Sequence, residues 1–360
     1  MPILDWLLED DAPGVAYLTR LRLLGESESS RSMIALRKRC NDYPPVAKML
    51  AAVEKCLKLG QIKNMGWGMR GDYDKYRGSY WTLIFLADLY AAPPSPSDSR
   101  VRALADHVLT SQLDNGGFSP SGTPKYEIVC LTANILRALV HFGYGHDPRV
   151  ISGYQRLAER IIPHGGVPCI VLETCLHTSC KMTLPQTLRS VAVAPSAAPK
   201  STMKKLREVL VRQMLDVRVF QYVRPDVKPY REAVKARSKG VAERTIRLQW
   251  LDKHSFDDDE LLPKPGWLRF GFPRSYNPDM LEAMLALAEI GVKYDPALED
   301  ALTHIEGKRL PDGRWKLDDS LNGKMLADIE KKGKPSKWIT LRALTVLSHF
   351  GRAQFTRPAP

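Results

Sequence analysis

Apolar runs of helical length alternate along this chain with short turns, and one kind of turn recurs. Four turns combine glycine with an aromatic or apolar residue and precede a helical apolar run: Met65-Gly66-Trp67-Gly68, Asn115-Gly116-Gly117-Phe118, His164-Gly165-Gly166-Val167 and Asp312-Gly313-Arg314-Trp315. The first three lie about fifty residues apart, a period typical of repeated helix–turn–helix units. The pattern therefore predicts a helical chain built from repeated hairpins.

The spacing of apolar positions, with glycine and proline as boundaries, predicts where the helices lie. The first is expected to be interrupted at Pro13-Gly14. The expected helices span residues 4–24, 45–59, 77–90, 98–113, 126–142, 148–162, 173–191, 202–217, 275–290, 296–305 and 335–350.

Within a hairpin, one helix is apolar on nearly every side and its partner carries charges at helical spacing. Residues 83–87 and 136–140 belong to the first kind, whereas Arg100, Arg102 and Asp106 lie on a helix of the second kind. The first pattern fits an inner helix, and the second an outer helix with one face in water. Stacked hairpins bury a continuous core, and a closed ring leaves no end exposed. We therefore expect an all-α fold, an α/α toroid of about five to six helical hairpins.

The same patterns divide the chain into three parts. Residues 1–60 are expected to form a helical segment packing on the ring, residues 61–350 the toroid, and residues 351–360 a tail. The periodicity fades between Phe220 and Pro265, so an irregular basic insertion is expected at about 200–265.

Charge changes the picture at this insertion. The chain has a net charge of +13, and residues 200–253 hold fifteen Lys and Arg against six Asp and Glu, a net charge of +9. This stretch is either a solvated helical face or a rim that attracts anions. It has neither regularly spaced stacking aromatics nor a recognisable reader motif, so we expect no specific nucleic-acid partner.

Composition bounds the class of protein. The chain has 360 residues, of which 44% are hydrophobic and 26% charged, enough to bury a large core. No apolar stretch reaches the length of a membrane helix and no signal peptide is recognisable at the N-terminus, so we expect a cytoplasmic protein without a membrane span. The six cysteines are too sparse for a disulfide scaffold.

Two of the turn sequences carry a resemblance to a known family. Ser111-Gln112-Leu113-Asp114-Asn115-Gly116-Gly117-Phe118 and Leu310-Pro311-Asp312-Gly313-Arg314-Trp315 resemble the Q-x-x-x-G-x-W/F repeat of squalene cyclases and protein prenyltransferase β-subunits, over roughly residues 60–350. Residues 67–89, 264–273 and 333–344 are similar to a group of bacterial squalene-cyclase-like proteins. The resemblance implies a terpenoid-cyclase-like toroid with its site in the central cavity.

The acid of squalene cyclases is missing from this chain. Those enzymes protonate an alkene with an Asp-x-Asp-Asp acid, and the nearest strings here, Asp257-Asp258-Asp259-Glu260 and Asp318-Asp319, do not match it. Ordinary squalene cyclisation is therefore not expected.

Two expected inner helices carry polar residues three or four positions apart, which places them on one helix face. One set is Glu127, Cys130, Asn134 and Arg137, and the other is Glu173, His177, Cys180 and Lys181. Buried polar groups must be paired, so the two stripes form either a small-molecule site or a closed hydrogen-bond network. As a site, Glu127, Glu173 and His177 are the candidate catalytic acids and bases.

Further residues are candidates for binding substrate. Asn134 lies in the first stripe, and an aromatic wall is expected from Tyr73, Tyr76, Tyr80 and Trp81, which also fit an ordinary core. Near the C-terminus, Arg269, Tyr276 and Lys337 could bind an anionic group or brace the turns.

Cys169, His177 and Cys180 form the sharpest local hypothesis. Thiolate and imidazole ligands suit zinc, and three ligands with an open position are typical of a catalytic site. The spacing is not that of a paired Cys-x-x-Cys knuckle, so buried free thiols are the alternative. The cofactor is otherwise unknown.

The sequence thus predicts an enzyme with its site in the toroid's central cavity. The expected chemistry is that of an acid–base lyase, isomerase or cyclase. Its substrate is expected to be a hydrophobic or aromatic small molecule, which could also carry an anionic group. The alternatives are a non-catalytic toroid that binds a ligand or partner through its basic insertion, and a glycan-processing toroid.

Overall fold

A computed structural model describes residues 3–60, 71–95, 98–168, 183–216, 223–225, 261–263, 266–274 and 276–355, of which 223–225 and 261–263 are described by their backbone alone. The described chain is almost entirely helical. The α-helices are α1 (Ile3–Leu7), α2 (Pro13–Arg22), α3 (Arg31–Arg39), α4 (Pro44–Lys58), α5 (Ser79–Asp88), α6 (Arg100–Thr110), α7 (Val129–His141), α8 (Pro148–Ile161), α9 (Leu184–Ala192), α10 (Lys200–Asp216), α13 (Met280–Glu289), α14 (Glu299–Gly307) and α15 (Lys337–His349).

Short elements complete the structure. The 3-10 turns are η1 (Cys40–Asp42), η3 (Gly71–Tyr73), η4 (Pro124–Tyr126), η5 (Tyr144–His146) and η7 (Pro296–Leu298). Strands β1 (Val223–Pro225) and β2 (Leu261–Pro263) form an antiparallel pair, in which Arg224 lies opposite Leu262. None of the helices in the described ranges is long and apolar enough to span a bilayer.

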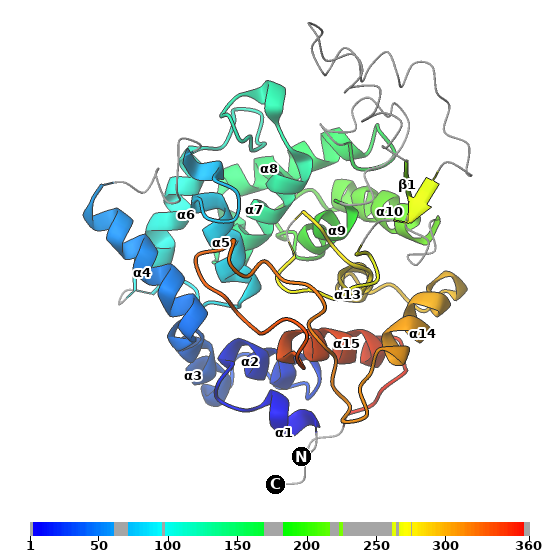
Figure 1. Ribbon diagram of the computed structural model, residues 1–360. Helices are drawn as coiled ribbons and strands as arrows, with labels where there is room; N and C mark the ends of the chain where they lie inside the picture. Colours follow the sequence, from blue (N-terminus) through cyan, green and yellow to red (C-terminus); the bar gives the residue numbers. More distant parts are fainter. Residues whose placement is uncertain are drawn as a thin grey trace, which may run out of the picture.

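The helices with the largest proportion of buried residues contact one another in a series. Helix α5 packs on α7, α7 on α9, α9 on α13, α13 on α15 and α15 on α2. Figure 1 shows these helices following one another around a common centre, with α4, α6, α8, α10 and α14 outside them. We call α2, α5, α7, α9, α13 and α15 the central helices.

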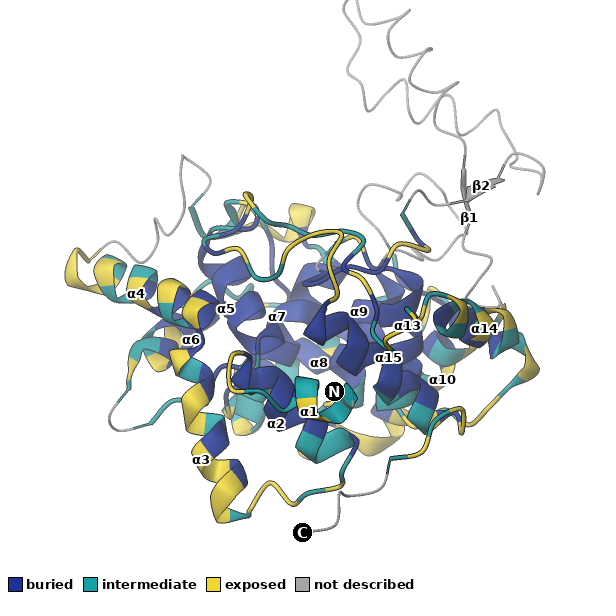
Figure 2. Ribbon diagram, turned by 60° about the horizontal axis from the view of Figure 1, so that its bottom comes forward, coloured by how far each residue is buried: buried dark blue, intermediate teal, exposed yellow. Residues whose placement is uncertain are grey.

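The difference between central and outer helices follows from their sequences. Every residue of α5 is buried, because apolar side chains cover all sides of the helix. In α6 only Val101, Leu104, Ala105, Val108 and Leu109 are buried, and the opposite face meets water. Figure 2 shows the same contrast between the buried α5, α7 and α9 and the exposed outer face of α4.

Helix α2 also approaches the end of α5. A Cβ atom added to Gly14 would lie 2.6 Å from the carbonyl oxygen of Leu89 and 3.2 Å from the Trp338 ring, so α2 fits closely between α5 and α15. Tyr17 of α2 packs on Tyr90, their ring centroids 5.3 Å apart. The proline that was expected to interrupt the first helix instead begins α2, a position at which its missing N–H is not needed.

Two of the repeated turns have the same hydrogen bonds. In one, the N–H of Leu113 donates to Gly117 and that of Gly116 to Leu113; in the other, Leu310 donates to Arg314 and Gly313 to Leu310. Gly116 and Gly313 both have φ of +86°, a backbone conformation that favours glycine.

Each of these turns is also fixed to the central helix that follows it. The N–H of Phe118 donates to Thr132 Oγ1 of α7 at 2.9 Å, and the N–H of Trp315 donates to Thr340 Oγ1 of α15 at 3.0 Å. The rings of Phe118 and Trp315 are fully buried. The aromatic residue of the repeat is therefore a brace between a turn and a central helix.

Candidate functional site

Charged side chains from successive central helices meet in the buried interior. Arg137 of α7 donates to Asp88 of α5 at 2.7 Å, and Arg189 of α9 lies 3.7 Å from the same Asp88. Arg189 Nη1 also donates to Glu282 of α13 at 3.1 Å. We call Asp88, Arg137, Arg189, Glu282, Glu289 and Arg342 the central charge cluster.

The pKa values of the two glutamates of this cluster are shifted in opposite directions. Burial opposes ionisation of Glu289, but Arg189 at 3.0 Å and Arg22 at 2.8 Å outweigh it and lower the pKa of Glu289 to about 2. Burial dominates at Glu282, where it raises the pKa to about 7 in spite of Arg342 and Arg189. Glu282 is therefore a fully buried carboxyl group that titrates near neutral pH.

Arg342 of α15 differs from the other arginines of the cluster. Its only ion pair in the described part of the chain is with Glu282 Oε1 at 3.7 Å, beyond hydrogen-bond distance. Its guanidinium lies over the ring of Phe272, 4.6 Å from the centroid, and Phe272 in turn stacks on Trp338 at 4.4 Å. Burial lowers the pKa of Arg342 below its usual value.

Several buried polar atoms around the cluster have no hydrogen-bond partner among the residues that the structure describes. They are Asp88 Oδ2, Asn134 Nδ2 and Gln186 Oε1, which come from three neighbouring central helices. The other end of the Gln186 amide donates to Glu282 at 3.2 Å. Unpaired buried polar atoms are costly, so a ligand or water that paired with them would be stabilised there.

An aromatic cluster lies at the N-terminal end of α5. The rings of Tyr73, Tyr76 and Tyr276 surround the fully buried Trp81, at centroid distances of 5.8, 5.3 and 4.8 Å. Tyr76 has φ of +71°, a strained conformation for an aromatic residue. Lys75 Nζ lies over the rings of Tyr76 and Tyr276, at 5.2 and 5.5 Å. The predicted residues Tyr73, Tyr76, Trp81 and Tyr276 are thus brought together.

The segment that precedes α13 connects the aromatic and charge clusters. Tyr276 packs on Trp81, whereas Phe272, four residues earlier, packs on Arg342. Burial and the neighbouring Cys130 raise the pKa of Tyr276 well above its usual value. Cys130 lies one turn before Asn134 on α7, so the predicted residue Asn134 lies between the two clusters.

Glu127 does not lie on α7, which begins at Val129. Its carboxylate receives hydrogen bonds from Arg156 of the outer helix α8 at 2.7 Å and from Asn115 at 3.1 Å. The structure therefore places Glu127 in a brace between the turn at 115–117 and α8, and does not bring it to the central charge cluster.

Three of the predicted binding residues lie apart from the aromatic cluster or are already paired. Tyr80 packs on Phe118 at 5.9 Å, and burial raises its pKa to about 12. Arg269 is exposed. Lys337 is buried and pairs with Glu9 at 2.7 Å and with Asp11, which ties α15 to the N-terminal segment.

The zinc hypothesis concerns residues outside the described ranges. Cys169, His177, Cys180 and the candidate base Glu173 all belong to residues 169–182, and Asp257–Glu260 also lies outside. Among the residues whose placement is described, no group of three or more His, Cys, Asp or Glu could hold a metal ion.

Asp72 is the centre of a polar cluster that was not predicted from the sequence. Its Oδ1 lies 2.6 Å from both Ser79 Oγ and His107 Nε2, and its Oδ2 accepts from Ser111 Oγ at 3.2 Å. Both serines donate to the aspartate, so this is not the Ser–His arrangement of an activated nucleophile. The cluster fixes the start of α5 to α6.

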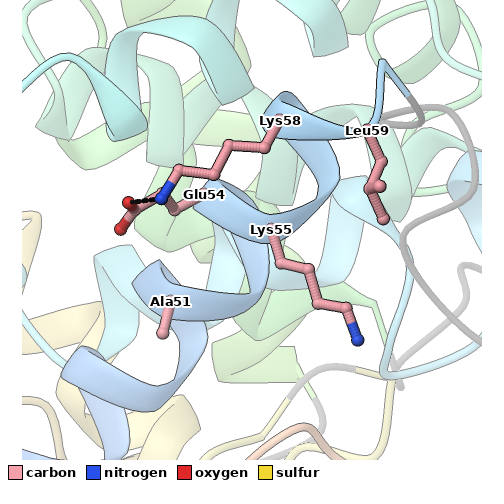
Figure 3. A pocket seen from close by; sticks show the side chains of 5 residues that line it. All are labelled: Ala51, Glu54, Lys55, Lys58 and Leu59. Atoms are coloured by element: carbon pink, nitrogen blue, oxygen red, sulfur yellow. Dashed lines mark ion pairs between the residues drawn. The ribbon is translucent and has the colours of Figure 1, made fainter.

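A pocket of about 460 Å³ lies on the outer helix α4, lined by Ala51, Glu54, Lys55, Lys58 and Leu59 (Figure 3). Lys58 and Glu54 form an ion pair at 2.6 Å along its wall. The described residues that line it belong to α4 and its C-cap Leu59, and none of them belongs to the aromatic or charge cluster.

Comparisons with known proteins add no relative. No protein-family model matches the chain, and no curated protein matches it.

Proposed function

We propose that the chain is an enzyme of the α/α-toroid type whose site lies between the central helices. The sequential contacts of the central helices and the repeated turn support the toroid. The resemblance of those turns to the squalene-cyclase repeat agrees with it, although fold alone does not specify chemistry.

The proposed substrate is a small hydrophobic or aromatic molecule. Tyr73, Tyr76, Trp81 and Tyr276 supply large apolar surfaces and ring faces to such a molecule. The strained backbone of Tyr76 supports this location, because strain is retained where the surrounding structure requires a particular orientation.

One observation carries the proposed chemistry: Glu282 is fully buried and its pKa is raised to about 7. A carboxyl group with such a pKa is present in both protonation states at neutral pH, as general acid–base catalysis requires. We assign to Glu282 the acid–base role that the sequence suggested for Glu127, whereas the candidates Glu173 and His177 lie outside the described residues.

The reaction class that fits is a lyase, isomerase or cyclase. Ionised Glu282 accepts a proton from a C–H bond, and the electron pair of that bond moves to the neighbouring carbon. In an isomerase, that pair forms a new double bond while the electron pair of an existing double bond shifts to the next carbon, where protonated Glu282 returns the proton. In a lyase, that pair forms the double bond while the bond from the neighbouring carbon to a leaving group breaks, and the group departs with its electron pair.

Solvent deuterium incorporation tests this proposal without knowledge of the final product. The protein is incubated in D₂O with arylpyruvates, aryl ketones and aryl-substituted unsaturated acids, and loss of C–H signals is followed by proton NMR. We expect exchange faster than in buffer for at least one compound class. Glu282→Gln, which keeps the shape of the side chain, should reduce it about 100-fold or more.

Two results would contradict the proposal. One is the absence of exchange above the buffer rate throughout the panel with folded wild-type protein. The other is wild-type exchange in Glu282→Gln, which would assign the proton transfer to another group.

A further inference from the structure

We propose that Arg342 binds a carboxylate group of the molecule held between the central helices. This inference rests on the proposed function, because it names the anionic part of the same ligand. The N–H groups of Arg342 donate to no acceptor among the described residues.

The first argument is the pairing of the arginines in and beside the central charge cluster. Arg22, Arg137 and Arg189 each donate at least one hydrogen bond to an acid of the interior, at distances of 2.7 to 3.1 Å. Arg342 donates none within the described ranges, and its nearest acid oxygen is 3.7 Å away. Its side chain is only 6% exposed, and its nitrogen atoms are not among the fully buried atoms without a partner, so a water molecule or a ligand can reach them.

The second argument is the balance of charge. Arg22, Arg137, Arg189 and Arg342 face three acids, Asp88, Glu282 and Glu289. Asp279, the N-cap residue of α13, is already bound by Arg274 at 3.1 Å and by the N–H of Gly271 at 2.7 Å. Counted with Arg22, which is 25% exposed and is not a member of the central charge cluster, four arginines share three acids, so an added anion would balance the charge.

The third argument is orientation. One face of the Arg342 guanidinium is covered by Phe272, and Phe272 is held by its stack on Trp338. A stacked guanidinium keeps its N–H groups free at the edge of the plane, where they match the two oxygens of a carboxylate. The aromatic cluster begins four residues further along the same segment, at Tyr276, so an aryl group and a carboxylate can belong to one ligand.

The position of Glu282 favours a carboxylate over a phosphate as the anion bound by Arg342. Its carboxyl group lies 3.7 Å from Arg342, so any anion bound there also meets this acid. A phosphate dianion is repelled more strongly than a carboxylate monoanion at the same position. The arrangement therefore favours the carboxylate.

Three ligands that differ only in the head group test the inference: 2-naphthylacetate, 2-naphthylacetamide and 2-naphthyl phosphate. Their dissociation constants are measured by calorimetry on the full-length protein. Wild-type protein should bind the carboxylate about tenfold or more tightly than the carboxamide, and more tightly than the phosphate. Tyr276→Leu should weaken the carboxylate and the carboxamide alike, which locates both at the aromatic cluster.

Substitutions at Arg342 separate binding from structure. Arg342→Gln should abolish the preference for the carboxylate and leave the carboxamide constant unchanged, and Arg342→Lys should restore part of it. Arg352→Gln removes an exposed arginine and should keep the wild-type preference. If Arg342→Gln does not fold, the dissociation constants of the carboxylate and the carboxamide on wild-type protein still show whether the site prefers the carboxylate.

The outcomes distinguish this inference from the proposed function. Equal binding of carboxylate and carboxamide overturns the role of Arg342 but leaves an aromatic site in place. Tighter binding of the phosphate overturns the choice of anion. An equal loss of both ligands in Arg342→Gln makes the residue structural, and failure of all three ligands to bind folded wild-type protein overturns both proposals.

Discussion

At the scale of single residues, Glu282 shows how the surroundings of a carboxyl group determine its protonation. Arg189, Arg342, Asp279 and Asp88 all act on it, but the cost of burial exceeds the attraction of the two arginines. Glu289, two turns later on the same helix, has two arginines in direct hydrogen-bond contact and remains ionised. Two glutamates on one helix therefore have very different pKa values, because their contacts with arginine differ.

This difference predicts the pH dependence of stability. The folded pKa of Glu282 is about 7 and its ordinary value is 4.5, so the folded state holds this proton more tightly and loses stability as pH rises from 4.5 to 7. Between pH 5 and 8 the loss is about 2 to 3 kcal/mol. Glu282→Gln should remove it, as measured by urea unfolding at both values.

Glu289 provides the control for that experiment. Its pKa is lowered to about 2, so its contribution is complete above pH 4.5 and is lost only as pH falls toward 2. It does not change between pH 5 and 8. If the unfolding free energies of wild-type protein and Glu282→Gln differ by the same amount at both pH values, the raised pKa is wrong.

The residues of the charge cluster had a recognisable but weak signal in the sequence. Arg189 is the one charged residue of α9, and Glu282 lies between Leu281 and Ala283 in the otherwise apolar first turns of α13. Their contact joins positions 93 residues apart, and helical periodicity gives no information on such a pairing. The prediction that Glu127 belongs to the polar stripe at 127–137 is wrong, because α7 begins two residues later.

At the scale of elements, the repeated turn depends on one threonine in each following helix. Thr340→Val keeps the side-chain shape and leaves the buried N–H of Trp315 without its acceptor, which should cost about 1 to 3 kcal/mol. Thr132→Val should have a similar effect at Phe118. The free energy of unfolding from denaturant titration measures both.

Thr345→Val is the matched control, because the hydroxyl of Thr345 donates only to the carbonyl of Leu341 one turn earlier in α15. It should change stability much less than Thr340→Val. Equal losses for the two variants would mean that threonine in α15 matters for the helix itself and not for the turn.

The elements were predictable from sequence to different degrees. Helices that are buried on nearly all sides, such as α5 and α7, and amphipathic outer helices such as α6 and α8 lie where the periodicity placed them. Helix α3 was not predicted, because it is short, strongly basic and buries only Met33 and Leu36. Its beginning is fixed by Ser30, whose hydroxyl accepts from the N–H of Met33.

At the scale of the whole molecule, α2 is one of the elements that join the first and last parts of the described chain. Gly14 permits its close approach to Leu89 and Trp338. Gly14→Ala would place a methyl group 2.6 Å from a carbonyl oxygen, so we expect a loss of about 1 to 3 kcal/mol in the free energy of unfolding.

Gly307→Ala tests whether this loss comes from crowding. Gly307 is also helical, and an added Cβ would meet nothing within 4 Å. That variant should be neutral or slightly more stable, since alanine favours helix more than glycine does. A similar loss in both variants would show that the close fit of α2 does not matter.

The position of α2 also affects how the chain matures during synthesis. Helices α1 and α2 are synthesised before α15, yet they pack on it, and Lys337 pairs with Glu9 and Asp11 more than three hundred residues away. Until that distant segment is made, the apolar surface of α2 has no cover from α15. Such long-range pairing slows folding and lengthens the time during which a nascent chain can aggregate or bind a chaperone.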